Sequence, residues 1–452
     1  MRFQRFRALA ALGLGLLLAA LPGQAQEGSA PPEPVRFLLE TITVSGAGEA
    51  AANIVRAETL LDEGRSYTEA DLVQAIARVH RLPFVLEATF ALKKGSQRGA
   101  YELAIDVQPA RWFFFDQWSH GFQFDEPVDL PEGRADALVG GRLFLGRSGV
   151  LFAALDTVEG AQAGFTQYDL FHRGILLSAV VSRTGGEQAT EVLPLTLDPT
   201  FASWSFEDST RVSLGLSVPA GPRQSVQASL SQRTGDARER RPVLVSEARF
   251  PVFFTGESSL TYRRAEVKWV YDTSDDPLLP TRGTSLSAGL EAARFESESL
   301  RPVTSSAFDP PLPPFEAEQV VLAVSVIRHF SITPRQTVTV SARGSAGQSR
   351  LENLFTGTSG GEEIELGNAS LDSLGGAVGV RHSVALRRHR ERGNLSDLRF
   401  ETGAEIGGER TAPDLGPSPL KRLSVSVGIV FRNQWGRVRA TFTYLDLGEV
   451  AR

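Results

Sequence analysis

The residue types that most often carry chemistry do not form a catalytic pattern in this chain. It has six histidines, and no two of them stand at the spacing of a metal-binding pair. It has no cysteine, which excludes disulfides and thiolate ligands. Neither a Gly-x-Ser-x-Gly turn nor a phosphate-binding loop stands between an expected strand and an expected helix. We therefore expect no catalytic site, no metal site and no cofactor.

The densest group of polar residues is Val270–Gly283, with the sequence VYDTSDDPLLPTRG. Asp272 and Asp275 suggest a calcium loop, but the glycine and the distal glutamate of an EF-hand are missing. Two prolines in the segment cannot continue a strand ladder. Strand-like runs flank it, Leu260–Trp269 before and Thr284–Phe295 after. The segment is therefore predicted to be a solvated turn between two strands.

The start of the chain has the composition of a secretory signal peptide. Arg2, Arg5 and Arg7 precede Ala8–Leu21, an apolar run that is too short to span a membrane. Small residues follow, and we expect cleavage after Ala25. Residues 1–25 are thus predicted to be a signal peptide and residues 26–35 a proline-rich linker.

The exported chain is acidic and carries no long apolar helix. Without the three signal arginines, the 47 basic side chains fall to 44 against 53 acidic ones, a net charge near −9. This balance argues against nucleic acid as a partner. No later stretch is apolar enough for a spanning helix, so entry into a membrane would require a closed barrel.

Residues 36–109 are predicted to form a small α+β domain of order β-α-α-β-β. The expected elements are a strand that ends at Gly46, a helix over Ala50–Leu61, a helix capped by Thr68 and Asp71, and strands at Phe84–Leu92 and Tyr101–Val107. About 75 residues are enough for one small core.

Residues 110–452 consist mostly of short runs in which apolar and polar residues alternate. In Leu423–Phe431, for example, Leu, Val and Ile alternate with Ser and Gly. In a soluble sandwich the apolar face would meet a second sheet, whereas the polar face here suits a wet lumen. The runs have the length and pattern of transmembrane barrel strands, and we count about 16 of them.

The turn resembles a signature of the BamA/TamA-like outer-membrane proteins, the barrel-assembly superfamily of the bacterial surface antigen type. In that family a Tyr-Asp-Thr turn and a following Pro-Thr-Arg-Gly join two barrel strands on the periplasmic side. The matching residues here are Tyr271, Asp272, Thr273, Pro280, Thr281, Arg282 and Gly283. The N-terminal domain, with its Val44-Ser45-Gly46 and Tyr67-Thr68, similarly resembles a POTRA domain (a polypeptide-transport-associated module). The resemblance covers roughly residues 37–445.

The family's long inward-folded loop has two possible counterparts in this sequence. Arg350–Gly379 occupies its place, and Gly375, Gly376 and Arg381 match its Gly-Gly and its tip arginine, although the tip's glycine and aromatic residue are missing. If this match holds, Arg381 reaches into the lumen and pairs with acidic groups. Alternatively, Gly375–Leu386 is the strand that follows the loop, and Arg381 is a lumen-facing strand residue.

The end of the chain departs from the family pattern. Family members close the barrel with a strand that ends in Phe or Trp, whereas Asp446–Arg452 is polar. Either that last strand is absent, or one strand upstream has been miscounted.

The resemblance implies an outer-membrane barrel with its POTRA domain in the periplasm. Its partners would be unfolded outer-membrane or secreted client proteins, outer-membrane lipids, and periplasmic chaperones or accessory subunits. A client would add a strand at the POTRA edge near Phe84–Leu92 and then pass through, or leave by, the seam between the first and last barrel strands. The alternatives are a secretion pore dedicated to one partner and a passive outer-membrane channel.

Overall fold

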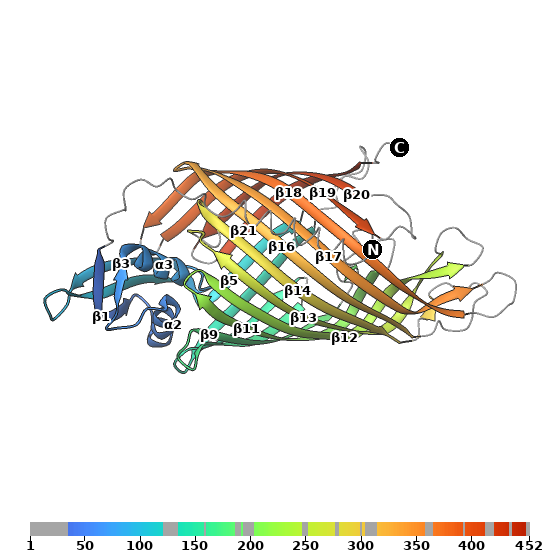
Figure 1. Cartoon of the computed structure of the whole chain (residues 1–452), viewed down its shortest axis with the longest axis horizontal. Helices are drawn as coiled ribbons and strands as arrows, with labels where there is room; N and C mark the ends of the chain where they lie inside the picture. Colours follow the sequence, from blue (N-terminus) through green and yellow to red (C-terminus); the bar gives the residue numbers. More distant parts are fainter. Residues whose placement is uncertain are drawn as a thin grey trace, which may run out of the picture.

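The protein is a large β-barrel with a small α+β domain at one end (Figure 1). The computed structural model describes residues 35–120, 134–157, 160–185, 191–192, 203–245, 252–275, 280–298, 301–302, 314–357, 365–391, 394–411, 420–433 and 436–448. The predicted signal peptide and nearly all of the predicted linker lie outside these residues. So do residues 358–364, which are part of the predicted loop Arg350–Gly379.

The N-terminal domain follows the predicted order, with one short strand added. Its elements are β1 (Arg36–Ser45), α2 (Glu49–Thr59), β2 (Ser66–Thr68), α3 (Glu69–Val79), β3 (Val85–Lys94) and β4 (Ala100–Pro109). The sheet order is β2-β1-β4-β3, with β1 parallel to β4 and β3 antiparallel to β4. The strand β3, fourth in this order, therefore forms an edge of the sheet.

Both helices have an apolar stripe, and α3 also has a side-chain N-cap. Leu72, Ile76 and Val79 of α3 are buried against the sheet, together with residues of α2. The backbone N–H of Asp71 donates to the Thr68 hydroxyl at 3.3 Å, and the Asp71 carboxylate accepts from the Thr68 N–H at 2.9 Å. This reciprocal pair is the predicted capping box, and it satisfies two backbone donors at the start of the helix.

Fifteen long strands of the described residues form the barrel, in line with the predicted count. They are β5 (Phe113–His120), β6 (Arg134–Leu145), β7 (Gly149–Asp156), β8 (Gly160–Leu170), β9 (Ile175–Gly185), β11 (Ser203–Gly221), β12 (Gln224–Val245), β13 (Val252–Asp272), β14 (Gly283–Ser297), β16 (Phe315–Thr333), β17 (Gln336–Gly357), β18 (Glu365–Glu391), β19 (Asn394–Thr411), β20 (Leu420–Asn433) and β21 (Gly436–Gly448). Two further pieces, β10 (Glu191–Val192) and β15 (Arg301–Pro302), pair at strand ends.

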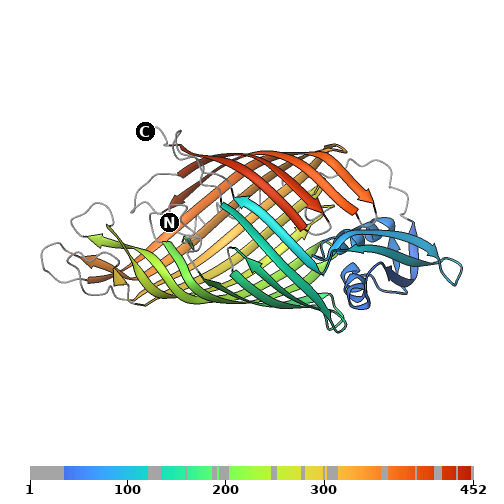
Figure 2. The same ribbon diagram turned by 180° about the vertical axis from the view of Figure 1, so that it is seen from behind.

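The long strands form a closed ring in which one contact between neighbours is parallel. Each strand pairs antiparallel with the next along the chain, and β9 pairs with β11. The ring closes between β21 and β5, where Gly436 to Ala440 lie parallel to Phe115 to Ser119 (Figure 2). With an odd number of alternating strands, the first and the last run in the same direction. The fold is thus the predicted antiparallel barrel, and among the described residues the contact between β21 and β5 is the one parallel pairing of ring neighbours.

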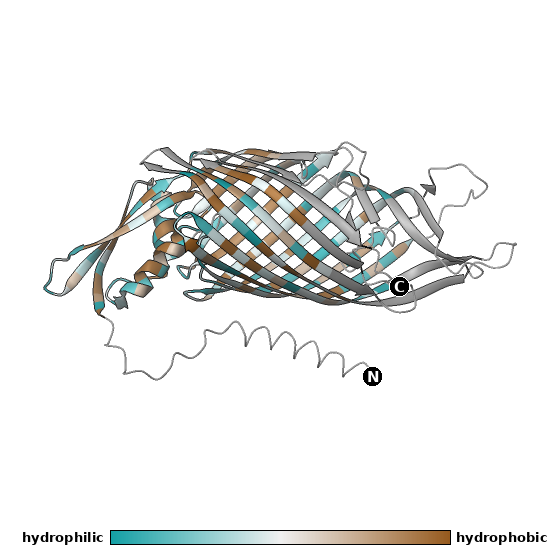
Figure 3. Cartoon of the chain, turned by 90° about the horizontal axis from the view of Figure 1, so that it is seen from above, coloured by the Kyte–Doolittle hydropathy of each residue, from teal (hydrophilic) through white to brown (hydrophobic). Residues whose placement is uncertain are grey.

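The outer face of the barrel is apolar, as a membrane-spanning barrel requires. Large apolar side chains stay exposed along alternate positions of the strands, for example Leu214 (49%), Leu230 (59%), Val267 (55%) and Leu290 (53%). Figure 3 shows this alternation as a chequered pattern of apolar and polar residues across the wall. The barrel is a transmembrane barrel with a polar interior. Neither helix of the described residues is long and apolar enough to cross a membrane.

The capping box gives a testable prediction for the N-terminal domain. Hydrogen bonds from Thr68 lower the pKa of Asp71, so its stabilisation is present above about pH 4 and is lost as the pH falls through the lowered pKa. We expect Thr68→Ala to cost about 1 kcal/mol at neutral pH, seen as roughly fivefold faster hydrogen exchange in α3 of the full chain. The difference from wild type should shrink at low pH. Equal exchange at neutral pH would contradict this role, and Gln97→Ala, in the β3–β4 turn, is the control.

Candidate functional site

The segment Val270–Gly283 is the turn between β13 and β14, as predicted. The Asp275 carboxylate accepts hydrogen bonds from the backbone N–H groups of Thr281 (2.8 Å) and Arg282 (3.2 Å). The Thr273 hydroxyl accepts from the N–H of Thr284 at 2.9 Å. The polar side chains thus satisfy backbone groups that the turn removes from the strand ladder.

Gly283 has a conformational reason to be glycine. Its φ is +114°, and a Cβ there would lie 2.4 Å from the Thr273 carbonyl oxygen. The carboxylate of Asp272 accepts from the N–H of Ser274 at 2.8 Å, which holds the aspartate at the end of β13. The aspartate is thereby presented to the N-terminal domain.

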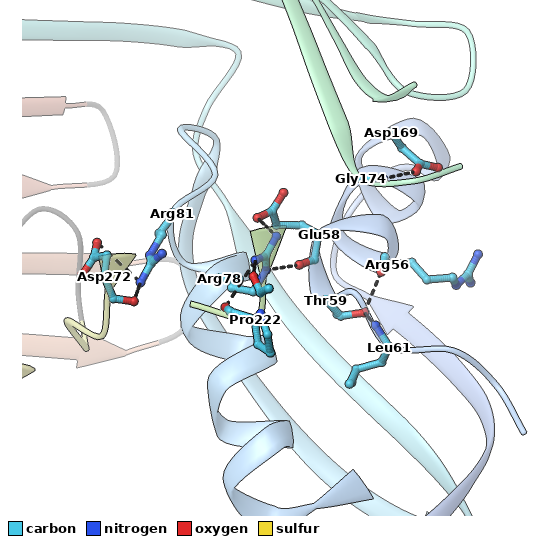
Figure 4. A network of polar contacts seen from close by, with 11 residues as sticks. Arg56, Glu58, Thr59, Leu61, Arg78, Arg81, Asp169, Gly174, Pro222 and Asp272 are labelled. Atoms are coloured by element: carbon cyan, nitrogen blue, oxygen red, sulfur yellow. Dashed lines mark hydrogen bonds and ion pairs between the residues drawn. The ribbon is translucent and has the colours of Figure 1, made fainter. Parts of the chain in front are cut away.

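Two arginines join the N-terminal domain to the barrel turns (Figure 4). Arg81 donates to the carbonyl oxygen of Asp272 at 2.8 Å, and its guanidinium lies 3.5 Å from the Asp272 carboxylate. Arg78 donates to the carbonyl oxygens of Gly221 (3.4 Å) and Pro222 (3.3 Å), in the turn between β11 and β12. Both arginines therefore bind main-chain oxygens of the barrel.

A partly buried carboxylate, that of Glu58, holds Arg78 in place. Glu58 of α2 lies 3.1 Å from the guanidinium, and the Glu58 carbonyl oxygen accepts from Arg78 Nε at 2.9 Å. Burial raises the pKa of Glu58, while the positive charges of Arg78 and Arg81 oppose that shift. The junction thus links α2, α3 and two barrel turns through one ion pair and several charge-assisted hydrogen bonds.

Apolar side chains complete the junction and merge the two cores. Phe84 of the N-terminal domain packs edge-on against Phe144 of β6 (5.0 Å between ring centroids) and Tyr168 of β8 (6.1 Å). Val150 and Tyr168 belong to the same buried cluster as the core of the domain. Arg142 of β6 donates to the carbonyl oxygen of Pro83 at 2.8 Å. The domain is therefore fixed against the barrel by a continuous core, and it does not hang on a free linker.

The edge of β3 is covered at Ala88 by the side chain of His80. His80 lies 2.9 Å from the Ala88 carbonyl oxygen and 3.4 Å from its N–H. Neighbouring residues of a strand point their polar groups to opposite sides, so Phe90 and Leu92 face the same edge as Ala88. Beyond His80, this edge presents backbone groups that an added strand can pair with.

The N-terminal sheet leads directly into the closing contact of the barrel. Only residues 110–112 separate β4 from β5, and β5 is one of the two strands of the parallel contact. Val85 lies opposite Pro109, so β3 starts at the barrel and runs away from it. The open edge and the parallel contact are thus joined by one short connection.

Gly375, Gly376 and Arg381 lie within β18, in register with β17 and β19. This placement agrees with the strand interpretation. The described residues of Arg350–Gly379 lie in β17 and β18 and do not form a long inward-folded loop, while residues 358–364 lie outside the described residues.

Arg381 faces the lumen, because Val378 and Val380 occupy the opposite, exposed face. On the same inner face, Arg343 of β17 pairs with Glu405 of β19, and Arg264 of β13 pairs with Glu291 of β14 at 2.8 Å. The lumen is therefore lined with charges of both signs.

The inner face is tightly packed toward the barrel end far from the N-terminal domain. Phe206 and Phe295 are almost fully buried; Arg233 lies over the Phe206 ring at 4.1 Å, and Tyr262 stacks on Phe295 at 4.4 Å. The tips of β12 and β17 also pair at Leu244 and Thr356, although three long strands separate them in the ring. This side of the far mouth is therefore filled by side chains and bridged by backbone.

Sequence reasoning found the turn and missed the junction that the turn serves. Arg78 and Arg81 fall on a helix whose pattern is that of an ordinary amphipathic helix, and Glu58 looks like a solvated residue. Their partners are main-chain oxygens far along the chain, which leave no mark in the sequence. The bulky residues around Phe84 are the one signal in the sequence, and their alternation predicts only a strand, Phe84–Leu92.

The structure of this chain is similar, at low sequence identity, to several solved structures. One is BamA from Haemophilus ducreyi lacking POTRA domains 1–3, with 11% identity, coverage of 92% of this chain and 82% of that chain, and a TM-score of 0.42. Another is CdiB from Acinetobacter baumannii, with 10% identity, 90% and 74% coverage, and a TM-score of 0.35. A third is OmpT of Vibrio cholerae, with 8% identity, 72% and 97% coverage, and a TM-score of 0.33. No family model and no curated protein matches the chain.

The junction predicts that Arg78 controls how firmly the domain is docked. We expect Arg78→Ala to weaken docking by about 2 kcal/mol, because it removes the charge-assisted hydrogen bonds to the carbonyl oxygens of Gly221 and Pro222. Spin labels at Gln97 and Thr333, in the full chain in detergent, should show a broadened distance distribution. Arg98→Ala, in the exposed β3–β4 turn, should leave the distribution unchanged. A narrow distribution in the Arg78 variant would show that the apolar contacts suffice for docking.

Proposed function

We propose that this chain is an outer-membrane factor that binds unfolded protein clients at the β3 edge and inserts them, or passes them across, at the β5–β21 contact. The observation that carries this proposal is the open β3 edge on a docked domain whose sheet continues into β5. The proposal needs no catalytic residue and no cofactor. The N-terminal domain would act as a POTRA domain, in the periplasm.

The β3 edge has the chemistry of a strand-addition site. Main-chain N–H and C=O groups at Phe90 and Leu92 supply affinity without demanding a particular client sequence. His80 limits the site at Ala88, so an added strand would pair with the outer half of β3. A client of this kind is an extended segment of an unfolded outer-membrane or secreted protein, delivered with or without chaperones or accessory subunits.

Of the contacts between neighbouring strands of the ring, we expect the β5–β21 contact to be the least stable. Five residue pairs join these strands, from Gly436 to Ala440, against twelve between β20 and β21. Parallel pairing is also slightly less stable per residue than antiparallel pairing. The free energy needed to separate two neighbouring strands, and so to open the wall to lipid or to a client strand, is therefore lowest at this contact.

Two other functions are considered for this chain, a secretion pore for one dedicated partner and a passive channel. The packed inner face around Phe206 and Phe295, with the β12–β17 bridge, works against a passive channel, because it fills part of the far mouth. The secretion pore shares the β3 edge and differs only in the number of clients. Client number therefore separates the two transport functions.

The test of the proposal is quantitative proteomics of isolated outer membranes after depletion of this protein. Loss of many unrelated barrels supports a general assembly factor, and loss of one surface or secreted protein supports a dedicated pore. An unchanged outer-membrane proteome would overturn both transport functions and leave the passive channel.

The β3 edge predicts a specific defect when its donors are removed. In the depleted strain, a copy with Leu92→Pro should restore less than a tenth of client levels, because proline removes an N–H at the open edge. Leu92→Ala loses the same side chain and keeps the N–H, so it should restore most of the function. Client levels are measured in outer membranes at equal amounts of the two variants. Equal rescue by both would rule out strand addition at this edge.

The parallel contact predicts that a covalent link across it blocks function. The native chain has no cysteine, so cysteines placed at Ser119 and Ala440, which face each other in the register, form the only pair. Oxidation should abolish client assembly, and a reductant should restore it. The control pair is Ala288 and Val324, in the wall between β14 and β16. Full activity of the oxidised Ser119/Ala440 pair would show that this contact need not open.

A further inference from the structure

The outer wall of the barrel contains a groove of about 820 Å³ across β11, β12, β13, β14 and β16. Its walls carry outward-facing apolar side chains, among them Val212, Leu214, Leu230 and Val320, each about half exposed. Because these side chains point away from the lumen, the groove opens to the membrane.

Two small residues at the centre of the wall create the groove. Ala265 of β13 and Ala292 of β14 face each other in the register and line it. Leu230 lies beside Ala265 on one side, and Val320 lies beside Ala292 on the other. Two alanines between larger side chains leave a trough two strands wide, which lipid chains must fill in the membrane.

A row of charged side chains borders the trough on the side away from the N-terminal domain. Arg263, Arg294, Glu318 and Arg350 lie in one register row on the same outer face. Arg263 stands nine residues from the end of β13; at about 3.3 Å per residue and a tilt near 40° this is about 23 Å, close to the height of the apolar band of a membrane barrel, about 25 Å. The row therefore lies at the headgroup level of the far leaflet.

The charges of this row and its neighbours are balanced. Arg294 contacts three carboxylates, Glu296 (2.8 Å), Glu316 (2.9 Å) and Glu318 (3.5 Å), and Arg263 contacts Glu296 at 2.8 Å. With Arg350, three guanidinium groups stand against three carboxylates. Such a set offers hydrogen-bond donors and acceptors without a positive field, which suits sugar hydroxyls better than phosphate, since a hydroxyl both donates and accepts.

We propose that this groove is a binding site for a glycolipid. Its acyl chains would lie in the Ala265–Ala292 trough, and its sugar headgroup would contact the Arg263–Arg294–Glu318 row. The site does not depend on the transport function proposed above, because a passive channel would present the same outer face. It would give this part of the wall a fixed lipid neighbour in place of exchanging bulk lipid.

The test uses purified full-length protein in mixed detergent micelles and native mass spectrometry. The probes are digalactosyl diacylglycerol, which has a sugar headgroup and no phosphate, and phosphatidylglycerol. We expect selective retention of the glycolipid, and at least a tenfold loss of retention in the double variant Ala265→Leu/Ala292→Leu. Ala288→Leu, on the same face of β14 and outside the groove, should retain the glycolipid as wild type does.

A second variant separates the headgroup from the trough. Arg294→Gln leaves the trough intact and should reduce the preference for the glycolipid over phosphatidylglycerol. Folding of every variant is checked by the heat-dependent shift of barrel proteins on electrophoresis. If the double variant does not fold, the Arg294→Gln variant alone tests the glycolipid site. Retention of neither lipid, equal retention of both by wild type, or an unchanged preference in Arg294→Gln would overturn the proposal.

Discussion

The constraint on which this structure depends is that no backbone hydrogen-bonding group of the wall can be left unpaired in lipid. Each strand must therefore find two neighbours, and the ring must close. Fifteen alternating strands close only with one parallel contact, and the structure places it between the first strand, β5, and the last, β21. One weak contact is thus a consequence of the strand count, and it falls where the N-terminal sheet joins the wall.

The docked N-terminal domain lies beside this weak contact and is held there. Its core runs into the barrel through Phe84, Phe144 and Tyr168, and Arg78 and Arg81 fix it to two turns. A domain held in this way keeps the β3 edge at a constant position relative to β5. Under the proposed function, strand addition at β3 and opening of the β5–β21 contact would take place next to each other.

Local patterns were enough to predict most of the fold. The capping box of Thr68 and Asp71, the alternation of the barrel strands and the turn at Val270–Gly283 all depend on residues close in sequence. The parallel closure was not predicted, because it depends on the total number of strands and on which ends meet. The role of Gly375, Gly376 and Arg381 stayed open for a related reason: alternation alone does not distinguish a loop folded into the lumen from a strand that extends beyond the membrane.

The arginines of the junction bind carbonyl oxygens of the barrel turns, at Gly221, Pro222 and Asp272. A carbonyl oxygen is present whatever side chain its residue carries. The β11–β12 turn can therefore change in sequence and still receive Arg78, provided that its backbone path is kept, whereas the β13–β14 turn also contributes the Asp272 carboxylate to Arg81. Relatives with little sequence in common could share this junction, and it would be found by comparing backbone paths and overlooked by comparing residues.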